Sequence, residues 1–88
     1  MLFTLGQVVA TPGAIATLAT LNINPASLVE RHANGDWSEM YDEDAEANRS
    51  AIEHGERILS SYVIQGEKVW VITEWDRSVT TILLPSEY

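Results

Sequence analysis

The chain contains no cysteine. This absence excludes a disulfide framework, a thiolate nucleophile and a cysteine-type zinc site, and nothing else in the composition calls for an oxidising compartment. With only 88 residues, the chain is expected to form a single small domain, residues 1–88, with a modest core. We expect a cytoplasmic protein.

Basic side chains are scarce: 5 Lys and Arg stand against 13 Asp and Glu, which gives a formal net charge of −8. Lys and Arg supply most of the sequence-independent affinity for nucleic acids, so the composition disfavours direct binding to DNA or RNA. It equally disfavours anionic membrane surfaces. An acidic surface suits solubility, or docking to a basic patch on another protein.

Charge is absent altogether from residues 1–29. The stretch has no basic leader and is interrupted by polar residues, Gly6, Gly13 and two prolines, so it resembles neither a signal peptide nor a membrane span, which needs about 20 apolar residues. We interpret it as the buried N-terminal third of a soluble domain.

Three helices are predicted from capping signals. Thr11-Pro12 and Asn24-Pro25 each pair an N-cap residue with a proline suited to the first helical position. They predict helices over about 12–21 and from 25 to Asn34-Gly35. Asp42 is the expected cap of a third helix that ends at Gly55. Its expected inward residues are Ala45, Ala47, Ala51 and Ile52.

The second half of the chain is rich in β-branched and aromatic residues. Runs over 58–64, 69–73 and 79–84 are separated by turn sequences at 65–67 and 75–78, which predicts a three-stranded antiparallel meander. Residues 1–10 alternate loosely and are compatible with a short strand or an irregular lead-in. The expected fold class is α+β, with short N-terminal helices and an acidic helix packed on this meander.

Several separated segments resemble a known group of proteins. They are Leu5–Ala14 (LGQVVATPGA), Arg31-His32, Gly35–Trp37 (GDW), Ile72–Glu74 (ITE) and Asp76–Pro85 (DRSVTTILLP). The chain is similar to the small "plasmid-related" proteins encoded on bacterial plasmids, integrative elements and phages. Trp75 stands where that pattern has a small residue such as Ala. The resemblance implies a mobile genetic element as the setting and no particular reaction.

The most unusual local feature is a run of six acidic residues without a base, flanked by aromatic side chains. It could present carboxylates to a basic nucleic-acid-binding groove, with the aromatic residues as anchors. Alternatively it is a solvated helix start stabilised by the helix dipole. Calcium or magnesium binding is a further alternative, but the spacing does not match an EF-hand loop. The candidate partner-binding residues are Asp36, Trp37, Glu39, Tyr41, Asp42, Glu43, Asp44 and Glu46.

Two other sets of residues suggest chemistry. His32 and Asp36 could form a metal site or an acid–base pair, although a histidine at a helix end beside the C-terminal dipole is the interpretation that we favour. Arg77 with Ser78, Thr80 and Thr81 could surround a scissile phosphate, with His32 or His54 as acid or base, as in a small ribonuclease-like toxin.

Among the tryptophans, Trp70 is expected in the core, whereas Trp37 and Trp75 are candidate exposed anchors.

These observations together favour a non-enzymatic accessory protein that binds a basic surface of a host protein, such as a restriction or CRISPR nuclease complex, and inhibits it. No catalytic residue, metal or cofactor is expected. A ribonuclease-like toxin and a homodimer of unknown role are the alternatives.

Overall fold

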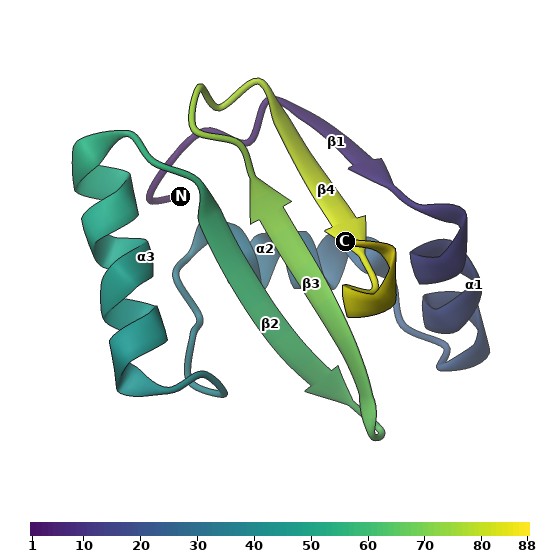
Figure 1. Ribbon diagram of the computed structural model, residues 1–88. Coiled ribbons are helices and arrows are strands. Elements are labelled where there is room, and N and C mark those ends of the chain that lie inside the picture. The colour runs from purple at the N-terminus through teal and green to yellow at the C-terminus, as the bar shows by residue number, and fades with distance from the viewer.

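The computed structural model describes residues 1–88 as three helices beside one mixed four-stranded sheet, with a short 3-10 helix, η1 (Pro85–Glu87), near the C-terminus. The α-helices are α1 (Pro12–Thr20), α2 (Pro25–Ala33) and α3 (Asp42–His54), and the strands are β1 (Gln7–Ala10), β2 (Ile58–Ile64), β3 (Glu67–Thr73) and β4 (Val79–Leu83). In Figure 1, α2 crosses behind the sheet, α3 stands beside β2, and η1 lies in front. No helix combines the length and the apolar character needed to cross a membrane.

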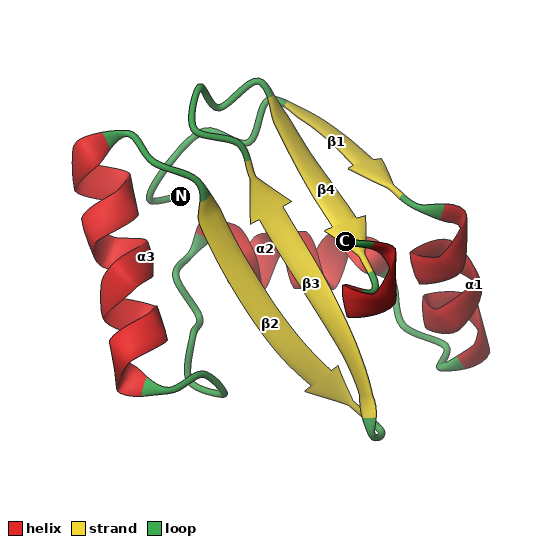
Figure 2. Ribbon diagram, viewed as in Figure 1, coloured by secondary structure: helices red, strands yellow, loops and turns green.

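The sheet has the strand order β1-β4-β3-β2 (Figure 2). Strands β2, β3 and β4 form the predicted antiparallel meander, with Ser60 opposite Val71 and Val71 opposite Ile82. The predicted sheet was incomplete, however, because β1 adds a fourth strand that runs parallel to β4, with Gln7 beside Val79. The α+β class is therefore confirmed, whereas the sheet is mixed and not purely antiparallel.

The helix boundaries follow the predicted capping signals closely. The Thr11 hydroxyl accepts a hydrogen bond from the Ala14 N–H, and the Asn24 side chain accepts one from the Ala26 N–H. Gly55 ends α3 in the left-handed conformation, with φ of 67°. The predicted cap of α3 was wrong by one residue: Tyr41 occupies the N-cap position without a side-chain hydrogen bond, and Asp42 is the first helical residue.

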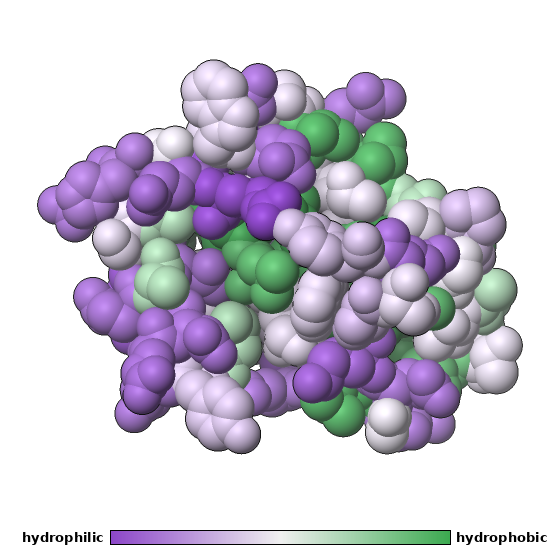
Figure 3. All heavy atoms as spheres, in the orientation of Figure 1, coloured by the Kyte–Doolittle hydropathy of each residue, from purple (hydrophilic) through white to green (hydrophobic).

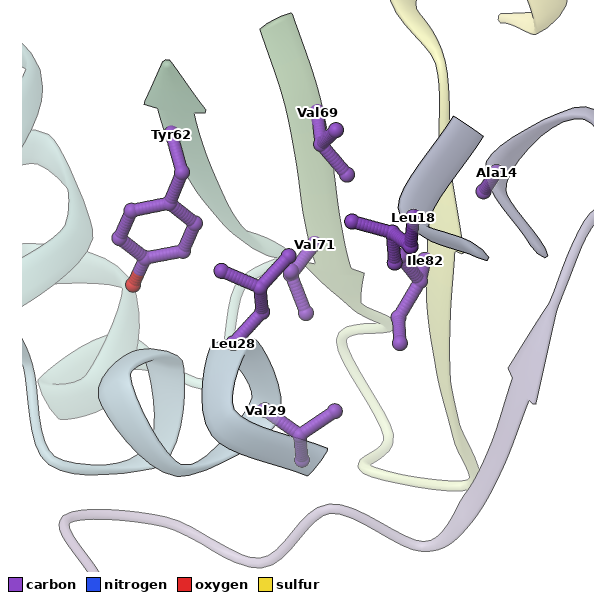
Figure 4. Packing of buried hydrophobic residues seen from close by; sticks show 8 residues of the cluster. All are labelled: Ala14, Leu18, Leu28, Val29, Tyr62, Val69, Val71 and Ile82. Atoms are coloured by element: carbon purple, nitrogen blue, oxygen red, sulfur yellow. The ribbon is translucent and has the colours of Figure 1, made fainter. Parts of the chain in front are cut away.

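The main core lies between the sheet and helices α1 and α2. Figure 4 shows Leu18 and Leu28 approaching Val71 and Ile82 of the sheet. This cluster consists of Ala14, Leu18, Leu28, Val29, Tyr62, Val69, Val71 and Ile82. Each of these side chains is at most 9% exposed, so their burial contributes hydrophobic stabilisation to the fold.

A second core cluster joins α3 and the N-terminal segment to β2. It consists of Phe3, Trp37, Ala45, Ala51 and Ile58. Leu5 packs against both clusters and so links them. Ala47, predicted to face inward, is exposed instead, and the buried position on that side of α3 belongs to Asn48.

The outer face of the sheet is only partly covered. Tyr88 follows η1 and packs edge-on against Trp70, with the ring centroids 5.6 Å apart. Trp70 is accordingly half-buried and does not belong to the central core, where it was predicted. The uncovered part of this face, between Trp70 and α3, forms one wall of the groove described below.

Candidate functional site

The acidic run that stood out in the sequence is divided by the fold into two parts. The first part, Asp36 and Glu39, lies in the loop between α2 and α3 and pairs with Arg31. Arg31 Nε donates to Asp36 Oδ2 and Arg31 Nη2 to Glu39 Oε2, each at 2.7 Å. The Arg31 guanidinium also lies 4.3 Å from the centroid of the Tyr62 ring. These two carboxylates therefore hold the loop in place.

The pKa values of both carboxyl groups are consistent with this role. The hydrogen bond from Arg31 lowers the pKa of Asp36, and a further hydrogen bond comes from the Ser38 hydroxyl. The pKa of Glu39 is lowered chiefly by the Val63 N–H, which donates to Glu39 Oε1 at 2.9 Å, and then by Arg31. Glu39 thus also accepts a hydrogen bond from a backbone N–H on the outer edge of β2.

Trp37 does not lie on the surface, which contradicts its expected role as an exposed anchor. Its side chain is 5% exposed, and its Nε1–H donates to Ser60 Oγ at 2.8 Å. The large apolar ring is stabilised by burial, and the polar edge finds an acceptor on β2. Trp75, in contrast, is 66% exposed, as expected for a residue of the β3–β4 turn.

The second part of the run remains on the surface. It consists of Tyr41, Asp42, Glu43, Asp44 and Glu46, which we call the acidic surface. Asp42, Glu43 and Asp44 occupy the first turn of α3, where the helix dipole favours negative charge. Glu46 lies one turn after Asp42 and Glu43 and so on the same side of the helix. In Figure 3, α3 is predominantly purple, the hydrophilic end of the scale.

Few basic groups neutralise the acidic surface. Arg49 Nε contacts Glu46 Oε2 at 2.9 Å, in an exposed pair that contributes little to stability. Asp42, Glu43 and Asp44 form no ion pair in the structure. Tyr41 stands beside them with 83% of its surface exposed. The result is a concentrated negative potential next to an exposed aromatic ring.

A groove of about 700 Å³ adjoins this surface, between α3 and the outer face of β2 and β3. Tyr41 and Asp44 belong to both features. Figure 3 shows hydrophobic atoms over β2 bordered by hydrophilic ones in this region. The groove lining is Glu39, Met40, Tyr41, Asp44, Ala47, Asn48, Arg57, Leu59, Ser61, Val63, Lys68 and Trp70.

His32 lies away from this groove, in the last turn of α2, and is fully buried. The nitrogens of its ring contact Ser60 Oγ at 2.6 Å and Thr73 Oγ1 at 2.8 Å. Burial lowers the pKa of His32 to about 4. Asp36, its suggested acid–base partner, pairs with Arg31 instead. The predicted position at the helix end is thus confirmed, but His32 is a buried core residue held by Ser60 and Thr73.

The turn suggested as a phosphate site is also occupied by structural contacts. Arg77 donates to four backbone carbonyl oxygens, those of Ala51, Glu56, Glu74 and Trp75. The Ser78 hydroxyl donates to Asp76 Oδ1, and the Thr80 hydroxyl to the Leu5 carbonyl oxygen. His54 is exposed and contacts the Ser50 carbonyl oxygen. The structure therefore gives the ribonuclease alternative no assembled set of catalytic groups.

No group of three or more histidine or acidic side chains is arranged to hold a metal ion. Comparison of the chain with family models, with curated proteins and with solved structures found no match.

Proposed function

We propose that this protein is a non-enzymatic accessory protein of a mobile genetic element and that it binds a basic surface of a host protein. One observation carries the proposal: four exposed carboxylates, of which only Glu46 has a basic partner, lie in the first two turns of α3, directly after the exposed Tyr41. Exposed acids at this density repel one another, and a basic partner relieves that repulsion.

The acidic surface is chemically complementary to a basic groove that binds nucleic acid. Carboxylates offer Lys and Arg side chains of the partner the same negative charge that phosphates would offer. An exposed tyrosine supplies contact area at a low cost in side-chain entropy, which is why tyrosine is frequent among interface hot spots. The partner that we propose is a host defence nuclease of the restriction or CRISPR type, held in the cytoplasm and inhibited by occupation of its groove.

The test is affinity capture from a nuclease-treated bacterial lysate with three immobilised proteins. The first is the wild type. The second carries Asp42→Lys, Glu43→Lys, Asp44→Lys and Glu46→Lys. The third is a control with the same change in net charge, made at exposed acids outside the acidic surface: Glu30→Lys, Glu53→Lys, Glu56→Lys and Glu67→Lys.

We expect the wild type and the control to retain the same basic nucleic-acid-binding protein and the second variant to lose it. A DNA duplex added to the column should release the captured protein, because it competes for the same groove. Circular dichroism verifies that all three proteins are folded. Retention of the partner by the folded second variant would exclude the acidic surface as the binding site.

A further inference from the structure

The two edge strands of the sheet differ in whether side chains hydrogen-bond their free backbone groups. At the β2 edge, the Asn48 side chain donates to the Leu59 carbonyl oxygen at 2.7 Å and accepts from the Leu59 N–H at 3.1 Å. Glu39 occupies the Val63 N–H farther along the same edge. Side chains from α3 and its preceding loop thus cover the β2 edge, which is one way in which proteins prevent unwanted strand pairing.

The β1 edge has no such cover. Gln7 N–H donates to the Ser78 carbonyl oxygen and Thr11 N–H to the Ile82 carbonyl oxygen, both at 3.0 Å. Because backbone groups alternate in direction along a strand, those of Val8 and Ala10 point away from β4. No side chain donates to or accepts from them, and β1 contains no charged residue or proline.

Two of the three exposed side chains of β1 are apolar, and the third, Gln7, is uncharged. Val8 is 46% and Val9 is 38% exposed. An open, uncharged edge with β-branched side chains favours pairing with another strand. In the strand order β1-β4-β3-β2, this edge is also the one opposite α3 and the acidic surface.

We propose that β1 pairs antiparallel with β1 of a second copy of this chain, so that two four-stranded sheets form one continuous sheet across a two-fold axis. Symmetry favours a second copy as the occupant, because the free donors and acceptors of Val8 and Ala10 can pair with the same groups of an antiparallel copy. Two molecules of charge −8 repel each other, and contact through β1 joins uncharged segments while it keeps the two acidic surfaces at opposite ends of the dimer. The dimer then presents two copies of the acidic surface, but its formation does not depend on the function proposed above.

One register of this pairing uses the free backbone groups of both residues in each copy. Val8 and Ala10 are the residues with free backbone N–H and C=O groups. Val8 of one copy therefore exchanges two hydrogen bonds with Ala10 of the other, and Ala10 of the first copy exchanges two with Val8 of the second. Val9 then lies opposite Val9 of the second copy in a pair without hydrogen bonds, where the Cα atoms are about 4.5 Å apart. That separation lies within the range that a disulfide bridges.

The test uses the absence of cysteine from the natural chain. Val9→Cys introduces one thiol at the axis, and Val63→Cys introduces one at an exposed position on the opposite edge strand, where Val63 is 51% exposed. Under mild oxidation we expect Val9→Cys to form a disulfide-linked dimer and Val63→Cys to remain monomeric over the same time. The mass of the wild type, measured by light scattering, should rise from 9.8 kDa towards twice that value as concentration increases.

Val9→Lys places two charges opposite each other and should abolish the rise in mass, whereas Val63→Lys should leave it unchanged. Three outcomes would overturn the proposal: a wild type that stays monomeric at all concentrations, a Val9→Cys protein that forms no more dimer than Val63→Cys, or a dimer that persists in a folded Val9→Lys protein. The quadruple lysine variant of the acidic surface should still dimerise, which separates a failure of this proposal from a failure of the proposed function.

Discussion

The ring of His32 accepts a hydrogen bond from the Ser60 hydroxyl at Nδ1, across 2.6 Å. The direction follows from the neighbouring groups. Thr80 donates its only hydroxyl proton to the Leu5 carbonyl oxygen, so Thr73 must donate to Thr80 and must itself accept from His32 Nε2–H. Burial lowers the pKa of His32 to about 4, so the ring is neutral and the proton on Nε2 is its only one; Nδ1 therefore accepts from Ser60, whose oxygen accepts from Trp37 Nε1–H.

This arrangement predicts a loss of stability in mild acid. The pKa of His32 is lowered to about 4 from 6.5, so between these values the unfolded chain binds more protons than the folded one. The free energy of unfolding should fall by about 3 kcal/mol as the pH drops through this window, and the His32 contribution should be constant below it. Urea denaturation at a series of pH values measures the effect.

His32→Gln serves as the control, because it removes the titrating group. The carboxyl groups with lowered pKa values, Asp36 and Glu39 among them, lose their stabilising contribution only as the pH falls through about 4 and below. The interval from pH 6.5 to 5 thus isolates the histidine. A wild type whose stability does not change over that interval would show that His32 titrates normally.

Asn48 should be the most sensitive polar residue of α3. Its amide makes two hydrogen bonds to the Leu59 backbone, and it is 5% exposed. Asn48→Ala leaves both backbone groups without their partner and should lower the free energy of unfolding by about 2 kcal/mol. Arg49→Ala, one residue along the same helix and exposed, should change it by less than about 0.5 kcal/mol. Faster amide exchange at Leu59 in Asn48→Ala would locate the effect, and equal stabilities of the two variants would contradict it.

Arg77 should affect stability and not catalysis. Its guanidinium joins the β3–β4 turn to the C-terminal end of α3 through the Ala51 and Glu56 carbonyl oxygens. Arg77→Ala should lower the free energy of unfolding by about 2 kcal/mol. Arg77→Lys should recover only part of this loss, because an ammonium group cannot reproduce the fork of donors. RNA cleavage by the wild type that disappears in a folded Arg77→Ala protein would instead support the ribonuclease alternative.

Gly6 is required where the N-terminal segment crosses the β3–β4 turn. A Cβ atom on Gly6 would lie 2.3 Å from the Ser78 carbonyl oxygen, and the residue has φ of 63°. Gly6→Ala should therefore cost about 3 kcal/mol or more, from strain and from the clash with backbone. Gly66→Ala is the matched control, since Gly66 also has a positive φ but has no atom near its Cβ position. It should cost about 1 kcal/mol, and thermal unfolding of both variants distinguishes the two effects.

The predictable part of the fold is the part with local signals. Thr11, Asn24 and Gly55 mark helix ends through their own hydrogen bonds or backbone conformation, so the sequence around them was sufficient to place the ends of the helices. Strand β1 has no such signal. It pairs with β4, so that Gln7 lies beside Val79, and no pattern within four residues predicts a partner so far along the chain.

The candidate site was predictable only in part for the same reason. The high density of acidic residues pointed to the start of α3 as a candidate site. The sequence could not show, however, that Glu39 binds Arg31 and the Val63 N–H whereas Asp42 stays exposed without a partner. Trp37 was misplaced because its acceptor, Ser60, lies on a strand outside its own segment. Asn48 did carry a signal that was missed: it stands three residues from both Ala45 and Ala51, and therefore on the buried side of the helix.

The most direct test of the proposed function is the dissociation constant between this protein and the host protein that it captures. A variant with Asp42→Asn, Glu43→Gln, Asp44→Asn and Glu46→Gln keeps the size of each side chain and removes its charge. We predict that this variant binds at least about tenfold more weakly than the wild type, and that added salt weakens the wild type more than the variant. Equal dissociation constants, with the same dependence on salt, would contradict binding through the acidic surface.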